Sequence, residues 1–224
     1  MKTGTTTRWT NPRTANTTSS WIRGAQRLAA VALLSITTLS FADTRVPDCA
    51  PGTLSDYQKL GAAGCMIGDK KFSNFHYQQG TSGLPSDAIS VTPGTTPETN
   101  DPGILFEGKW ASTQQESFVS YTVEATPNGK PITGASLEMQ FGQITGNGKA
   151  QVVARLCPAG GLDASSKPQK LQLQVVLSPD KSKKSMDQGQ FKDPQQQVRV
   201  TTPVDVSTGR GGTAELDGFM TVFR

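Results

Sequence analysis

The chain has 224 residues, with 34% hydrophobic and 18% charged side chains, 23 glycines and 14 prolines. Glycine and proline between segments rich in Thr, Val and Ser are typical of strands and turns, which argues against a mainly helical fold. The formal net charge is +4, but removing the five basic residues of the first 42 leaves 17 basic and 18 acidic residues. That balance argues against a nucleic-acid partner, because phosphate binding needs a surplus of Lys and Arg.

The first 42 residues have the organisation of a secretory signal peptide. A basic, acid-free segment precedes the apolar stretch Leu28–Phe41, which at 14 residues is short for a membrane span. Small residues at Ser40 and Ala42 predict cleavage before Asp43. We therefore expect a secreted, periplasmic or cell-surface protein with no stable membrane span after cleavage. An uncleaved leader that acts as an N-terminal anchor is the alternative.

A short helix is predicted over residues 53–60, at the start of the folded chain. Thr53 is a favourable N-cap, and Asp56 stands three residues later in the position of a capping-box partner. Leu54 and Tyr57 fall on one face of this helix, and Gly61 supplies a left-handed stop. Two helical turns are unstable in isolation, so a cross-link or tertiary packing has to hold them.

Cys49 and Cys65 flank this helix at a separation of 16 residues. A disulfide that closes a loop of this length contributes about 3 kcal/mol in the chain-entropy model. The alternative is a metal or redox pair, which the absence of Cys-x-x-Cys spacing and the shortage of further ligands disfavour. Cys157 has no obvious partner, which leaves a buried free thiol or an intermolecular disulfide.

Strands are predicted for most of the remaining chain. Phe72 and Phe75 lie three residues apart in the first of them, which requires a bulge or burial on both faces. Gly146-Asn147-Gly148 predicts a hairpin turn, Pro203 an interruption and Gly218 a bulge. Residues 178–197 are predicted to form a solvated loop, and 80–102 a loop with one edge strand. The nine predicted strands are 70–79, 88–91, 104–110, 119–125, 137–141, 152–156, 171–177, 198–206 and 213–223.

This pattern predicts an all-β protein with one short N-terminal helix. About nine strands with turn signals between them favour a single antiparallel β-sandwich domain, jelly-roll-like, over residues 43–224. Alternation of apolar and polar residues indicates that each sheet has one solvated face.

The sequence offers no recognisable catalytic constellation. His76 is the only histidine, and no nucleophile motif accompanies it. No phosphate-binding glycine loop, zinc motif or EF-hand loop is present, so we expect no enzyme, metal or cofactor. Trp110 and Tyr121 are candidates for an aromatic sugar-binding platform, although their inward register favours core packing. The remaining candidates are dispersed carboxylates: Asp69, Asp87, Asp101, Glu107 and Glu124.

The segment 53–75, TLSDYQKLGAAGCMIGDKKFSNF, combines a Leu-x-x-Tyr helix with the pattern Gly-Cys-x-Ile-Gly-Asp-x-x-Phe-x-x-Phe. It resembles secreted bacterial proteins of uncharacterised function that are frequent in Acidobacteria and often carry a PEP-CTERM sorting tail. Looser matches at residues 106–110, 146–148 and 212–214 extend the likeness. The second cysteine that relatives often have downstream of Cys157 is absent here, as is a Pro-Glu-Pro motif before Arg224. The resemblance implies an exported β-sandwich and nothing about catalysis.

Two functions follow as hypotheses. The first is a structural or adhesive role outside the cytoplasm, through contacts with polysaccharide or with envelope and matrix proteins. The alternative is a carbohydrate-binding, lectin-like module, with or without a structural calcium ion held by loop aspartates.

Overall fold

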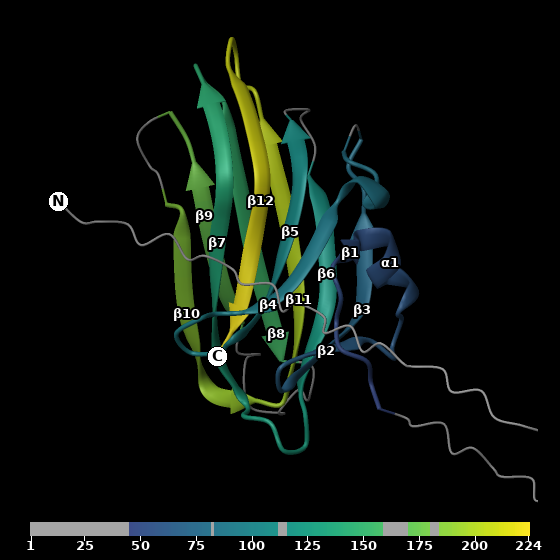
Figure 1. Ribbon diagram of the computed structural model, residues 1–224. Coiled ribbons are helices and arrows are strands. Elements are labelled where there is room, and N and C mark those ends of the chain that lie inside the picture. Colours follow the sequence, from purple (N-terminus) through teal and green to yellow (C-terminus); the bar gives the residue numbers. More distant parts are fainter. Residues whose placement is uncertain (1–44, 82, 112–115, 159–169, 180–183) are drawn as a thin grey trace, which may run out of the picture. The chain divides into compact units, whose positions relative to one another are not determined.

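A computed structural model describes residues 45–81, 83–111, 116–158, 170–179 and 184–224. Their strands form two six-stranded antiparallel sheets that pack face to face as a β-sandwich, with a short helix at one side (Figure 1). The predicted fold class is thereby confirmed. The predicted signal peptide, residues 1–42, lies outside the described residues. Within the described ranges, no helix is long and apolar enough to cross a membrane.

Sheet 1 contains, in spatial order, β1 (Gly52–Thr53), β4 (Ser90–Thr95), β5 (Pro102–Ala111), β12 (Thr213–Phe223), β7 (Ile132–Thr145) and β10 (Met186–Gln195). Sheet 2 contains β2 (Cys65–Ile67), β3 (Lys70–Gln78), β6 (Ser117–Ala125), β11 (Gln197–Ser207), β8 (Lys149–Pro158) and β9 (Leu171–Leu177). The helical elements are α1 (Leu54–Lys59) and the single 3₁₀ turn η1 (Ser86–Ala88).

The last eight strands follow the jelly-roll connectivity. β5 pairs with β12, β6 with β11, β7 with β10 and β8 with β9, which is a set of nested antiparallel pairs. Successive strands therefore alternate between the two sheets for most of this region.

The described chain has twelve strands, so the predicted number of about nine is wrong. The three missed strands are β1, β2 and β10. β1 and β2 have two and three residues, too few to show an alternation. β10 was predicted as part of the solvated loop, because Phe191 is its only buried large apolar residue among polar ones. Backbone pairing with β7, rather than apolar burial, holds β10 in place.

Two turn assignments also need correction. Gly146, with φ +52°, does begin a tight turn, but this turn joins β7 to β8, which belong to different sheets. It is therefore a connection across the sandwich and not a hairpin. Pro203 does not interrupt β11, since it is the Cα partner of Phe118 on the β6 side. The ladder to β8 is instead broken at this proline, which has no N–H to donate there.

The predicted bulges are confirmed. The register of β3 against β6 shifts between Ser73 and His76, where Asn74 has φ +55°. This shift allows both Phe72 and Phe75 to be buried against Tyr121, with ring centroids 6.2 and 5.4 Å away. β12 likewise changes register against β5 next to Gly218.

Candidate functional site

The disulfide and α1 form a compact unit at one edge of the sandwich. Cys49 and Cys65 are joined as predicted, with Cα atoms 4.8 Å apart. The capping box is also confirmed, since the N–H of Asp56 donates to Thr53 Oγ1 and the N–H of Thr53 donates to Asp56 Oδ2, both at 3.2 Å. Hydrogen bonds from Lys59 and Thr53 lower the pKa of the Asp56 carboxyl to about 2.

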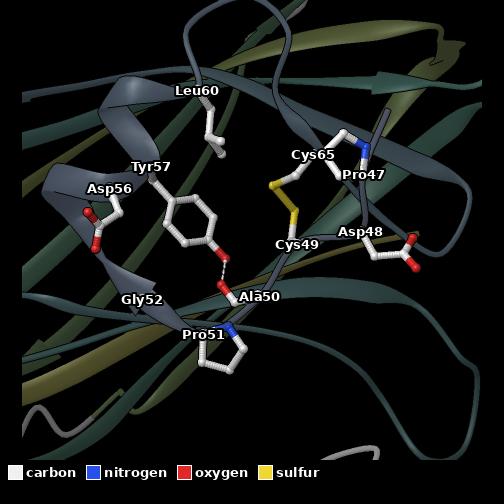
Figure 2. A pocket seen from close by; sticks show the side chains of 10 residues that line it. All are labelled: Pro47, Asp48, Cys49, Ala50, Pro51, Gly52, Asp56, Tyr57, Leu60 and Cys65. Atoms are coloured by element: carbon white, nitrogen blue, oxygen red, sulfur yellow. Dashed lines mark hydrogen bonds between the residues drawn. A yellow bond between two sulfur atoms is a disulfide. The ribbon is translucent and has the colours of Figure 1, made fainter. Parts of the chain in front are cut away.

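A small apolar pocket of about 340 Å³ lies between this unit and the preceding segment, Pro47–Gly52 (Figure 2). Figure 2 shows the disulfide on one side of it and Tyr57 on the other. The Tyr57 hydroxyl donates to the carbonyl of Ala50 at 2.8 Å, and burial raises the pKa of this phenol. These contacts fasten the entering chain to α1, which gives the pocket a structural role.

Trp110 and Tyr121 do not form an exposed aromatic platform. Trp110 is 5% exposed and Tyr121 is 1% exposed. Tyr121 lies between the sheets, within 5.8 Å of the Phe106 ring of sheet 1, and the Trp110 ring lies 5.8 Å from that of Phe219. We therefore correct the candidate ligand-binding assignment of both residues to core packing, the interpretation that their register favoured.

A larger, polar depression lies on sheet 1. We call it the polar groove; its volume is about 690 Å³ and it spans strands β5, β12 and β7, which are neighbours in Figure 1. Five of its side chains are charged or carry an amide, and the remainder are small. The lining residues are Ala88, Ser90, Glu107, Gly108, Lys109, Gln143, Glu215 and Asp217.

A β-bulge shapes the groove. Trp110 is paired with Leu216 and Glu107 with Gly218, so Gly108 and Lys109 of β5 together face one residue of β12. Bulges of this type bend a strand and re-aim its side chains. A Cβ at Gly108 would lie 2.8 Å from Leu84 Cδ1, so a larger residue there has to displace the Leu84 side chain.

The polar side chains of the groove come from three strands. Glu215 and Asp217 lie two positions apart on β12 and are half-buried, and Gln143 is the Cα partner of Glu215 on β7. Glu107 and Lys109 are exposed on β5. Within the described part of the chain, none of these five has an ion pair or a side-chain hydrogen bond, so their donors and acceptors are available to a ligand.

The structure places only one of the sequence-derived carboxylate candidates in the groove. Glu107 is joined there by Glu215 and Asp217, which the sequence analysis did not single out. The Glu-x-Asp spacing in the last strand was the available signal, since it puts two acids on one face. Asp69 instead pairs with Lys70 at 2.6 Å, and His76 is exposed on sheet 2 opposite Ser120.

The groove has no ligand set for a metal. Among the described residues, no group of three or more His, Cys, Asp or Glu side chains is placed to hold a metal ion. Its carboxylates accept hydrogen bonds, while Lys109 and the Gln143 amide donate them. The arrangement is therefore suited to a neutral ligand with many hydroxyl groups, each of which both donates and accepts.

The fold and this groove together define a jelly-roll β-sandwich with a shallow polar depression on one sheet. No protein-family model and no curated protein matches the chain. Among solved structures, it is similar to the module TmCBM61 in complex with beta-1,4-galactotriose, with 11% identity and a TM-score of 0.30 over 68% of this chain and 90% of that one. It is also similar to the enzymatically active domain of tailspike protein 4 from bacteriophage CBA120, with 12% identity and a TM-score of 0.27 over 70% of this chain and 20% of that one. Both likenesses are too distant to carry a function over to this chain.

Proposed function

We propose that the protein is an extracytoplasmic attachment module that binds a neutral polysaccharide in the polar groove and has no catalytic activity. The observation that carries this proposal is the convergence on one depression of five polar side chains that have no partner among the described residues. A saccharide ring presents hydroxyl groups at several angles, and such a set of donors and acceptors can satisfy them.

The affinity expected for one groove is low. None of the described residues that line it is aromatic, so recognition depends on hydrogen bonds. About four of them at a net 0.5–1.5 kcal/mol each give about 4 kcal/mol, which corresponds to a Kd of about 1 mM. Attachment to a repetitive polymer tolerates this weakness, because many copies can bind along one chain.

The charge of the groove favours a neutral glycan over an acidic one. Three carboxylates, on Glu107, Glu215 and Asp217, face one ammonium group on Lys109. A uronate or sulfate group brought into this groove meets like charges, which is unfavourable.

The Cys49–Cys65 disulfide supports an extracytoplasmic location. Disulfides persist in oxidising compartments and are rare in the cytosol. The predicted leader agrees with this, and a binding role outside the cell needs no cofactor.

The test is a glycan array followed by calorimetric titration of the exported protein with the neutral polysaccharides that bind, with and without a calcium chelator. We expect Glu215→Gln with Asp217→Asn to weaken binding at least tenfold, while the chelator has no effect. Glu124→Gln with Asp205→Asn, on the other sheet, is the matched control and should bind as the wild type does. Unchanged binding by the groove variant, no binding to any neutral glycan, or release of reducing sugar would each contradict the proposal.

A further inference from the structure

Two arginines lie close together on the outer face of sheet 2. Val198, Val200 and Val204 of β11 are buried, so the alternate residue Arg199 points outward. Arg199 is the Cα partner of Cys157 on β8, and Arg155 is the Cα partner of Thr201 on β11. The two arginines are therefore diagonal neighbours on adjacent strands, roughly 7–8 Å apart at the backbone, and both are exposed.

The positions next to these arginines carry no charge. Arg199 lies between Thr122 of β6 and Cys157 of β8. Arg155 lies between Thr201 of β11 and Gln172 of β9. We call these six residues the arginine face.

Neither guanidinium is neutralised within the described chain. Arg155 and Arg199 have no ion pair and no side-chain hydrogen bond there. By strand pairing, the nearest carboxylate is that of Glu124, which lies diagonal to Arg199. Glu124 is also the Cα partner of Lys71 on the neighbouring strand β3. Asp205 pairs with Gln151, four positions from Arg155 along β8.

We propose that the arginine face binds an acidic polysaccharide, a glycan that bears carboxylate or sulfate groups, across strands β11 and β8. Guanidinium groups bind such anions through two parallel hydrogen bonds, and within the described residues neither arginine is held in an ion pair. The surrounding Thr and Gln side chains can bind sugar hydroxyls. This site is separate from the polar groove and does not depend on the function proposed for it.

A polysaccharide fits this face better than a nucleic acid does. Single-stranded nucleic acid is held by stacking on aromatic side chains as well as by charge, and the six residues of the arginine face include no aromatic ring. The chain after residue 42 also has no net positive charge, whereas nucleic-acid binding relies on a large basic surface.

Cys157 provides a native probe of this face. It is the one cysteine of three outside the disulfide, it is partly exposed, and it lies beside Arg199. A bound glycan should therefore shield its thiol from a maleimide reagent, while a glycan bound in the polar groove should not.

The experiment measures binding of the exported protein to polygalacturonate and dextran sulfate, with uncharged dextran as the control, at low and high salt. We expect Arg155→Gln with Arg199→Gln to weaken binding to both anionic polymers at least tenfold, and salt to weaken wild-type binding. Arg210→Gln, at an exposed turn, is the matched control. It also replaces an arginine by glutamine and removes one positive charge, and it should have little effect on binding. Polygalacturonate should also slow maleimide labelling of Cys157 at least threefold.

Other outcomes overturn the proposal. Equal binding by the wild type and by the double arginine variant, or equal weakening by Arg210→Gln, would show that the arginine face is not the site. Stronger competition by DNA than by either acidic polymer would assign the face to nucleic acid instead. The Glu215→Gln, Asp217→Asn variant should keep its affinity for polygalacturonate. Loss of neutral-glycan binding in the polar groove is therefore distinguishable from loss of acidic-glycan binding at the arginine face.

Discussion

The outer faces of the two sheets differ in shape and in charge, although they share one core. On sheet 1 the register between β5 and β12 breaks at Gly108 and Lys109, and the polar groove lies at this break with three carboxylates and one lysine. On sheet 2, β11 pairs with β6 in unbroken register from Gln197 to Val204. Arg199 of β11 and Arg155 of the neighbouring strand β8 are exposed on this sheet. The polar groove thus lies at a bulge, whereas the two arginines lie on strands that pair in constant register.

This comparison shows how one jelly roll can offer two different surfaces. The inward residues of both sheets are constrained by packing, so they are alike in chemistry. The outward residues are not constrained in this way, and their charges can differ from one sheet to the other. The following predictions test which features the two faces share and which belong to one face alone.

A change in the shared core should affect both faces together. Tyr121 is 1% exposed and contacts aromatic rings of both sheets. Tyr121→Ala removes a ring from this packing and should lower the free energy of unfolding by about 3–5 kcal/mol. Denaturant titration measures this, and binding to both classes of glycan should be lost at the same denaturant concentration. Tyr121→Phe keeps the ring and is the control; equal loss in both variants would contradict a packing role.

The disulfide should stabilise the sandwich without contributing to either face. Cys49→Ser with Cys65→Ser should lower the free energy of unfolding by about 3 kcal/mol, because the unfolded chain gains the freedom of a 16-residue loop. Glycan affinities measured well below the melting temperature should not change. Cys157→Ser serves as the control and should leave the stability nearly unaltered. A cysteine-pair variant as stable as the wild type would refute the role assigned to this cross-link.

The shape of the polar groove should depend on one glycine. In Gly108→Val the new side chain would overlap Leu84, since even a Cβ lies 2.8 Å from its Cδ1. We expect a loss of about 1–3 kcal/mol in stability and at least tenfold weaker binding to neutral glycans, with binding to acidic polysaccharide retained. Ala62→Val, at an exposed position after α1 and outside the groove, should change neither. If Gly108→Val bound neutral glycans normally, the bulge would not be what shapes the site.

The smallest effect is expected where the edges of the two sheets are tied together. Asp187 of β10 accepts from the N–H of Gln174 in β9 and pairs with Lys184, both at 2.8 Å. Desolvation alone would raise the pKa of Asp187, but the hydrogen bonds from Lys184 and Gln174 and the Lys184 charge hold it below its ordinary value. The stability gained is therefore fully present above the unfolded-state pKa and lost as the pH falls through the lower folded-state pKa.

For this partly exposed pair the contribution should not exceed about 1 kcal/mol. Asp187→Asn should accordingly reduce the loss of stability in acid, measured by thermal melts from neutral pH down to pH 2. Asp205→Asn is the control and should retain the wild-type pH profile. If the pH profile of Asp187→Asn matched that of the wild type, the contacts of Asp187 with Lys184 and Gln174 would contribute nothing to stability.

Much of the local structure was predictable from the sequence. The capping box at Thr53 and Asp56, the left-handed residue Gly61 and the bulge between Phe72 and Phe75 all depend on neighbours a few residues apart. The Cys49–Cys65 pairing followed from the short loop that it closes. The cleaved leader before Asp43 stays a prediction, because residues 1–44 lie outside the described part of the chain.

The candidate sites were not predictable in the same way. Glu107 of β5 and Glu215 of β12 are more than 100 positions apart, yet both line the polar groove. Arg155 and Arg199 become neighbours only because β8 and β11 pair. The turn at Gly146 has the residues of a hairpin, but its two strands enter different sheets.

By itself, therefore, the sequence determined which side of each well-patterned strand faces the core, where α1 begins and ends, and which two cysteines are close. These features depend on a period of two residues or on contacts between near neighbours. Only the tertiary structure decided which strands lie side by side, and so which polar residues meet on each outer face. The physical reason is that alternation records the burial of a strand but not the identity of its partner, which the packing of the whole chain selects.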